Sequence, residues 1–359
     1  MSTAQKILLL GFSLFSTVCF AGEKYEVVLL GDLHYAAEDI VEADKITPHR
    51  RNTLKRYLQA WEEHIPDLLK RVAEYSAKPD VIFTVQCGDI TNGDEGNYEI
   101  SRTCFERVLK LVNQGNKKSV YVVRGNHDLE GKGKEKACND VLYEYMKKQD
   151  VIFPMPGKDQ TCCKIVGRDL FIFFDGMKES LEALELAIKV KPDARHIFLF
   201  SHLPVMPCRF SPPAIHYICG RYTNHNNGDK IRSLLIKNNV IVLAAHTHLT
   251  SYFDWKTPEG SLKQFVSFSV VRDPAAMPEK IAYTGTEYFQ LFEKYYPILS
   301  EKDRTDLQNV LKRYIGKLDS CVQYKNVSGF NVLRIDGNNV FVDVYCGKLD
   351  KAVYTQKIK

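Results

Sequence analysis

The chain has 359 residues, of which 45% are hydrophobic and 26% are charged, a composition that excludes a disordered or fibrous protein. Lysine plus arginine number 49 and aspartate plus glutamate 44, and the resulting net charge of +5 is too small over this length to indicate a nucleic-acid-binding protein. The length allows one large domain or two ordinary ones.

The first predicted segment is a secretory signal peptide over residues 1–21. Lys6 precedes an apolar stretch, and Cys19 and Ala21 are the small residues that cleavage after Ala21 requires. The alternatives are a buried first helix or strand, and a lipid anchor at Cys19, which the preceding Val18 disfavours. No other segment approaches the ~20 apolar residues of a membrane helix. We therefore expect an exported chain, periplasmic or secreted, without stable membrane insertion.

Strand and helix patterns then alternate, which predicts a layered α/β fold. Pro66 lies inside the first helical pattern and is expected to restart that helix. The predicted strands are 25–30, 81–86, 119–123, 170–174, 197–200 and 240–244, and the predicted helices are 51–77 and 98–113.

The pattern changes after His248. Residues 250–255 and 264–271 are predicted strands, and most of 274–318 is predicted to be helical. Two further strands, 330–335 and 340–345, flank Asp336-Gly337, a hairpin signal. No linker divides the chain, so we expect one catalytic domain over 22–359 with a helical cap inserted at 274–318.

Five polar clusters stand where predicted strands end. Ligands in open α/β sheets bind outside the carboxyl ends of the strands, so these clusters are expected to share one site. Each cluster alone has an ordinary explanation, because Gly-Asp is usually a turn and His-x-His is common. Together and in this order they indicate a functional site. The clusters are Asp32-Leu33-His34, Gly88-Asp89, Gly125-Asn126-His127-Asp128, Ser201-His202 and His246-Thr247-His248.

The clusters supply carboxylates, imidazoles and one amide, and the chain has no Cys-x-x-Cys pair. Oxygen and nitrogen ligands without thiolate suit Zn²⁺, Mn²⁺, Fe or Mg²⁺. The candidate ligands are too many for one tetrahedral ion but enough for two ions if one carboxylate bridges them. Two ions about 3.5–4 Å apart can clamp both the attacking and the leaving oxygen of an in-line displacement. The candidates are Asp32, His34, Asp89, Asn126, His202, His246 and His248.

From Val27 to about Tyr345, this pattern resembles the calcineurin-like metallophosphoesterase superfamily. The resemblance implies a four-layer α/β/β/α sandwich of two mixed sheets, with two metal ions at one edge. It implies that His127 is the catalytic histidine and that Asp128 orients it. Ala245, where the family usually has glycine, implies a slightly shifted backbone. By the resemblance, Asp32, His34, Asp89 and His248 hold one metal, and Asp89, Asn126, His202 and His246 hold the other, with Asp89 bridging.

Two features help to place the chain within that superfamily. Purple acid phosphatases have a tyrosine where this chain has Asn92 and a non-histidine residue where it has His34, which argues against that branch. The secreted nucleotidases carry a sizeable C-terminal substrate domain, for which the chain after His248 is short. The pattern most resembles the bacterial-type phosphodiesterases.

We therefore expect an exported, metal-dependent phosphoesterase that hydrolyses a small-molecule phosphate mono- or diester, with diesters favoured. A hydroxide bridging two divalent or mixed-valence metal ions would be the nucleophile, and phosphate scavenging would be the role. A nuclease of the same superfamily is one alternative, which the small net charge disfavours. A non-catalytic metal-dependent binding protein is the other, although no ligand is missing. The sequence predicts no substrate-binding residue and no oligomeric state.

Overall fold

The structure of the chain is a computed structural model. The described residues are 24–41, 48–208, 217, 227–267, 269–270, 279–284, 287–288, 290, 293–294, 296–314, 318–325, 328–347 and 350–359. The predicted signal peptide lies outside them, as does part of the predicted cap. None of the helices within these ranges is long and apolar enough to cross a membrane.

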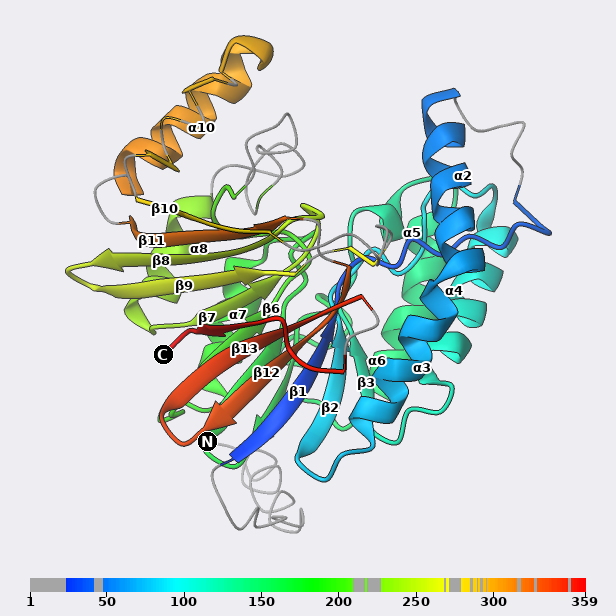
Figure 1. Ribbon diagram of the computed structural model, residues 1–359, viewed down its shortest axis with the longest axis horizontal. Helices are drawn as coiled ribbons and strands as arrows, with labels where there is room; N and C mark the ends of the chain where they lie inside the picture. The colour runs from blue at the N-terminus through cyan, green and yellow to red at the C-terminus, as the bar shows by residue number, and fades with distance from the viewer. Residues whose placement is uncertain are drawn as a thin grey trace, which may run out of the picture.

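Two mixed β-sheets lie face to face at the centre of the molecule (Figure 1). In the first sheet, β1, β2 and β3 are parallel, and β12 pairs antiparallel with β1. Its strands, in spatial order, are β14 (Tyr354–Lys357), β13 (Asn339–Cys346), β12 (Gly329–Asp336), β1 (Lys24–Leu30), β2 (Val81–Gln86) and β3 (Val120–Val122).

The second sheet has eight strands. Its parallel core consists of β5, β6, β7 and β9, and antiparallel strands flank that core on both sides. In spatial order the strands are β10 (Glu279–Tyr283), β11 (Leu318–Lys325), β8 (Thr250–Thr257), β9 (Gly260–Val266), β7 (Ile241–Ala244), β6 (Ile197–Phe200), β5 (Asp169–Phe173) and β4 (Cys162–Val166).

Aromatic side chains fill the space between the sheets. Phe83 of β2 packs edge-to-face against Phe171 of β5, with ring centroids 5.1 Å apart. Tyr121 of β3 stacks on Phe173 of β5 at 4.8 Å. Both faces of these strands are buried, which explains why they are almost continuously apolar in sequence.

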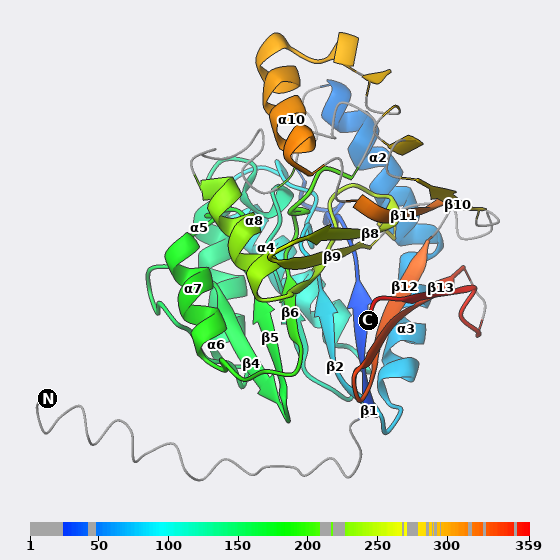
Figure 2. The same ribbon diagram turned by 90° about the vertical axis from the view of Figure 1, so that its left-hand side faces the viewer.

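Helices cover the outer face of each sheet. α2 (Pro48–Glu63), α3 (Ile65–Ser76) and α4 (Tyr98–Asn113) lie on the side of the first sheet, and α7 (Leu181–Lys189) and α8 (Gly228–Lys237) lie on the side of the second (Figures 1 and 2). The layers are helices, sheet, sheet and helices, which confirms the predicted fold. Asn97 caps α4 by accepting hydrogen bonds from the backbone N–H groups of Glu99 and Ile100.

Short helical turns follow β3, and a longer helix stands near β10. The turns are η2 (His127–Leu129), α5 (Lys134–Cys138), η3 (Asn139–Tyr143) and α6 (Glu144–Lys147), and η6 (Tyr296–Ile298) precedes α10 (Glu301–Tyr314). In both views α10 and α2 extend from the end of the molecule toward which β1 runs (Figures 1 and 2).

The helix predicted over 51–77 forms as α2 and α3, and the restart expected at Pro66 is confirmed, because α3 begins at Ile65 with that proline in its first turn. One predicted element needs correction. Within 274–318, where mostly helix was expected, Glu279–Tyr283 forms β10, and β11 begins at Leu318. β10 is a largely exposed edge strand that pairs only with β11 among the described strands, so it lacks the alternating apolar pattern of a half-buried strand.

Candidate metal centre

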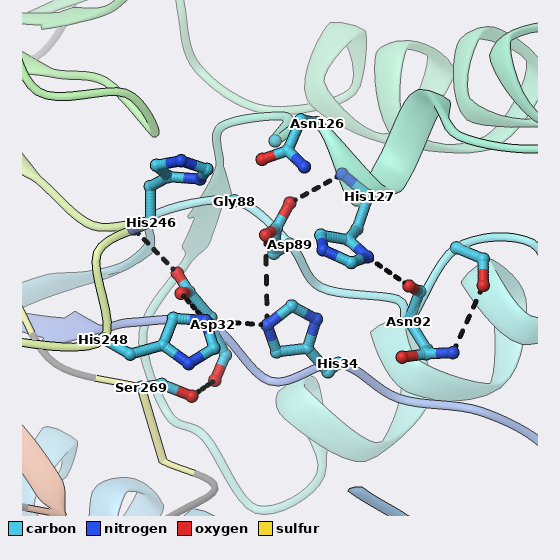
Figure 3. A network of polar contacts seen from close by, with 12 residues as sticks. Asp32, His34, Gly88, Asp89, Asn92, Asn126, His127, His246, His248 and Ser269 are labelled. Atoms are coloured by element: carbon cyan, nitrogen blue, oxygen red, sulfur yellow. Dashed lines mark hydrogen bonds and ion pairs between the residues drawn. The ribbon is translucent and has the colours of Figure 1, made fainter. Parts of the chain in front are cut away.

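The predicted ligand residues converge at one edge of the two sheets. Asp32 and His34 follow β1, Asp89 follows β2, and Asn126 follows β3. From the other sheet, His202 follows β6, and His246 and His248 follow β7. Because the strands of each set are parallel, their carboxyl ends lie at the same edge, and the loops after them meet (Figure 3).

The first group of donor atoms belongs to Asp32, His34 and His248, whose side-chain donors are close enough to hold one metal ion. Nε2 of His248 lies 2.9 Å from Oδ2 of Asp32 and 3.1 Å from Nε2 of His34. Asp32 and His34 are fully buried. These are three of the four side chains that the resemblance implied for one of the two metals, the fourth being Asp89.

The second group is centred on His202. Its Nε2 lies 3.1 Å from Oδ1 of Asn126, 3.1 Å from Nδ1 of His246 and 3.2 Å from Oδ2 of Asp89. The donors of Asp89, His202 and His246 also form a group that could hold a metal ion. Nδ1 of His202 lies 2.9 Å from the carbonyl oxygen of Cys87. This contact orients the ring so that Nε2 faces the other donors of the group.

Asp89 lies between the two groups. Its Oδ2 is 3.2 Å from Nε2 of His202 and 3.9 Å from Nε2 of His34. Its Oδ1 accepts a hydrogen bond of 2.9 Å from the backbone N–H of His127. One carboxylate oxygen therefore faces both groups of donors, which is the position that a bridging ligand requires.

The spacing of the donors fits metal ions. Metal–ligand bonds of about 2.0–2.2 Å place neighbouring donors of one ion roughly 3–3.5 Å apart. The closest donor pairs in the two groups are 2.9–3.2 Å apart. Such a buried concentration of carboxylates and imidazoles is costly unless cations compensate it.

The local backbone is strained to bring the donors together. His34, Asp89, His246 and His248 have φ values of 46°, 50°, 69° and 53°, which place them in the left-handed region that non-glycine residues rarely adopt. Strain of this kind collects at functional sites, where the surrounding structure enforces it. Gly125 is required for space, because a Cβ there would lie 2.2 Å from Oδ1 of Asp89.

The protonation states suit ligation. Burial raises the pKa of Asp89, but the neighbouring His202 and His127 outweigh that effect and hold the pKa well below its usual value. Burial lowers the pKa of His34 well below its usual value, so its imidazole is neutral. Burial also lowers the pKa of His202, but Asp89 and Asp32 raise it to about 9 without a metal. A metal ion would take the place of that proton.

His127 is partly exposed, and its side chain lies close enough to the donors of His34 and Asp89 to form a third possible metal-binding group with them. Its ring lies edge-on to that of His34, with centroids 4.7 Å apart. Its Nδ1 hydrogen-bonds to the backbone carbonyl oxygen of Asn92 (Figure 3). Because a carbonyl oxygen only accepts hydrogen bonds, Nδ1 carries the proton, and Nε2 is the nitrogen that remains for a substrate.

The role predicted for Asp128 needs correction. Its carboxylate does not serve as the orienting partner that the resemblance implied, because its hydrogen bonds go to Ile90, Thr91 and Gly125. Oδ1 accepts from the backbone N–H and the hydroxyl of Thr91, each at 3.0 Å, and Oδ2 accepts from the backbone N–H of Gly125 at 2.8 Å. Asp128 therefore connects the loop after β2 to the loop after β3. The hydrogen-bond partner of the His127 imidazole is instead the Asn92 carbonyl.

Sequence reasoning missed three residues near the centre. The Asn92 carbonyl has no sequence signal, because every residue carries one. Tyr57 stacks on His34 from within α2, where its spacing is that of an ordinary buried helix face. Glu95 is fully buried and accepts a hydrogen bond from the backbone N–H of Gly93. The one sequence signal for Glu95 is that a charged residue stands so close to the Gly88-Asp89 cluster.

Two solved structures are similar to this chain in fold. The purple acid phosphatase PPD1 from yellow lupin (Lupinus luteus) seeds has 11% sequence identity and a TM-score of 0.51, over 94% of this chain and 54% of that enzyme. PhoD has 11% identity and a TM-score of 0.52, over 93% of this chain and 68% of PhoD. At these identities the likeness shows the fold, and this chain spans about half the length of the lupin enzyme. No curated protein matches the chain.

The sequence itself matches a family model over more than half of its length. The matched region, residues 25–249, runs from β1 to the end of the His246-Thr247-His248 cluster and so contains every candidate ligand. Fold, sequence match and convergent donors agree, and the chain belongs to the calcineurin-like phosphoesterase family.

Proposed function

We propose that the protein is an exported, metal-dependent hydrolase of small-molecule phosphate esters, with diesters preferred to monoesters. The observation that carries the proposal is the convergence of two groups of buried and partly buried donors on the carboxylate of Asp89. Family membership supports the class of reaction.

Each group of donors would hold one metal ion. Asp32, His34 and His248 would serve the first, and Asn126, His202 and His246 would serve the second, with Asp89 shared. When bound, a pair of metal ions offsets the charge of the phosphoryl oxygens and lowers the pKa of water. The amide of Asn126 contributes a donor without adding negative charge, which favours an anionic substrate.

His127 would act on the leaving group. Its Nδ1 is held by the Asn92 carbonyl, so Nε2 is directed to the substrate side with a defined orientation. With Nδ1–H donating to that carbonyl, the imidazole carries a second proton on Nε2 only in its imidazolium form, and in that form it can donate the Nε2 proton to the departing ester oxygen, which is general acid catalysis. The role of Asp128 is then to hold the loop that carries Asn126 and His127.

The preference for diesters rests on the sequence pattern. Asn92 stands where the purple acid phosphatases have a tyrosine, and its side-chain amide donates to the carbonyl of Gly93. Export rests on the apolar N-terminal segment after Lys6, which lies outside the described residues. The position of α10 at the end of the molecule toward which β1 runs supports a cap over 274–318.

A parallel assay tests the proposal. Purified protein is loaded separately with Mn²⁺, Zn²⁺, Fe or Mg²⁺ and is offered nitrophenyl phosphate, bis-nitrophenyl phosphate and plasmid DNA. We expect hydrolysis of the diester above the monoester with at least one metal, and none with Asp89→Ala. Cleavage of plasmid DNA as the main activity would identify a nuclease. Metal binding without hydrolysis of any of the three would identify a binding protein.

A further inference from the structure

Glu95 and Lys134 form an ion pair that is fully buried behind the candidate site. Nζ of Lys134 donates to Oε2 of Glu95, and both side chains are 0% exposed. The ammonium group also lies 4.7 Å from the centre of the Phe105 ring. Removing two charges from water costs free energy that their mutual attraction often fails to recover, so stability alone is a weak reason for such a pair.

The other carboxylate oxygen of Glu95 connects the ion pair to the site through a backbone hydrogen bond. Oε1 accepts a hydrogen bond of 2.8 Å from the backbone N–H of Gly93. That N–H belongs to the same peptide group as the carbonyl of Asn92, and this carbonyl accepts the hydrogen bond from Nδ1 of His127. Because the peptide group is planar and trans, its N–H and C=O point in opposite directions, so fixing the first direction fixes the second.

The surroundings leave this peptide group little freedom. The preceding peptide group is also fixed, because the backbone N–H of Asn92 donates to the carbonyl of Tyr35 at 2.8 Å. Gly93 has φ of 79°, and a Cβ at that position would lie 2.7 Å from the carbonyl oxygen of His127. A carboxylate acceptor makes the bond from Gly93 a charge-assisted one, and hydrogen bonds in a chain polarise one another.

We propose that Glu95, held in place by Lys134, is a positioning residue for His127 that acts through the Asn92–Gly93 peptide group. The relay runs from the ammonium group to the carboxylate, through the peptide group, to Nδ1 of the imidazole. It lets a carboxylate orient the imidazole without touching it, in place of the contact expected from Asp128. The proposal rests on the proposed function only in that His127 serves the leaving group.

A pair of double variants separates orientation from packing. Lys134→Met with Glu95→Gln removes both charges but keeps an oxygen that can accept from Gly93. Lys134→Met with Glu95→Met removes the acceptor as well, at similar volume. Arg195→Met with Asp169→Asn removes another buried ion pair, at the start of β5 and thus away from the site, and serves as the control.

The activity readout is the ratio of alkyl-ester to nitrophenyl-ester hydrolysis by the metal-loaded protein. We expect the acceptor-free variant to lower this ratio about 10- to 100-fold, because a misplaced general acid matters most for a poor leaving group. The glutamine variant and the control should keep the wild-type ratio. A wild-type ratio in the acceptor-free variant, or an equal fall in all three variants, would overturn the proposal.

A second readout does not depend on activity. In Zn²⁺-loaded protein with ¹⁵N-labelled histidine, the Nδ1–H signal of His127, assigned with His127→Ala, should shift in the acceptor-free variant and not in the glutamine variant. An unchanged signal in the acceptor-free variant would refute the relay. If the wild-type protein hydrolyses neither ester, the proposed function fails, and the signal still decides on the relay.

Glu130 is the competing partner, because its Oε2 lies 3.7 Å from Nδ1 of His127. That distance is beyond a hydrogen bond, and the Glu130 side chain is 41% exposed. Glu130→Gln should therefore leave both the ester ratio and the His127 signal unchanged. A shift of the signal in Glu130→Gln as large as in the acceptor-free variant would assign the orienting role to Glu130 and contradict the relay.

Discussion

The ring of Tyr57 lies flat against the imidazole of His34, with centroids 4.2 Å apart and planes 1° from parallel. Nδ1 of His34 is buried and has no hydrogen-bond partner among the described residues. A metal-ligating histidine normally donates its outer N–H to a carboxylate, carbonyl or water that fixes the ring. Here the face of Tyr57 provides that constraint, and it does so from α2, a helix outside the five loops of the site.

Tyr57→Leu should weaken the binding of one metal ion. Loss of a group that orients a ligand typically costs about 10- to 100-fold in metal affinity. We expect that loss at the site of Asp32, His34 and His248, and near wild-type affinity at the other site, as measured by stepwise metal titration. Tyr57→Phe keeps the ring and should bind both ions normally. Equal affinities in the leucine and wild-type proteins would show that the stacked ring does not position His34.

His127→Ala should discriminate between leaving groups. An alkoxide needs a proton as it departs, whereas nitrophenolate is already a stable anion. We expect a loss of about 10²–10⁴-fold in kcat on an alkyl ester and a far smaller loss on a nitrophenyl ester, with metal content retained. His196→Asn, directly before β6 and away from the site, is the matched control. An equal loss on both esters would mean that His127 stabilises the phosphoryl group instead.

Asp128→Asn should lower activity on both esters. Its two oxygens accept from the backbone of Thr91 and Gly125, and an amide nitrogen would face one of these donors. Leaving a buried donor unsatisfied costs about 1–3 kcal/mol, so a lower melting temperature is expected. The loop that carries Asn126 and His127 would loosen, so activity on the nitrophenyl ester, which needs no general acid, should fall together with activity on the alkyl ester. A loss confined to the alkyl ester, with an unchanged melting temperature, would restore a direct role in orienting His127.

Iron-loaded protein should lack an intense purple colour. The position at which purple acid phosphatases carry their tyrosine is Asn92, whose side chain binds the Gly93 carbonyl. The ring of Tyr35, the tyrosine next to His34 in sequence, packs edge-on against Trp61 at 4.8 Å. A visible absorption spectrum checks the prediction. A strong charge-transfer band would show that a tyrosine reaches the iron after all.

The fold, and the convergence of the ligand-type residues at one edge of the sheets, could be predicted from the sequence for one physical reason. Parallel strands buried on both faces are long apolar runs, and the polar residues that end them share one edge of a sheet. Asp32 and His246 are far apart in the chain, but both directly follow such runs. Edge strands such as β10 lack this signal, because neither face is buried enough to impose a pattern.

The contacts that orient His127 and His34 could not be predicted from the sequence. Asp128 follows His127 directly, and adjacency suggested contact, but in the short helical turn η2 the two side chains diverge toward different partners. The true partner of His127 is a backbone carbonyl, and the stacking partner of His34 comes from α2. Contacts of these kinds depend on three-dimensional packing and carry no residue-specific spacing.

Two metal ions that share Asp89 should be visible in the metal content of the protein after reconstitution and removal of free metal. We expect about two ions per chain for the wild-type protein, by elemental analysis, because two groups of donors converge on that carboxylate. Asp89→Ala should lose affinity at both sites, while Asp193→Ala, which removes a highly exposed aspartate, should bind as the wild type does. Two ions bound by Asp89→Ala with unchanged affinity would contradict the ligand assignment.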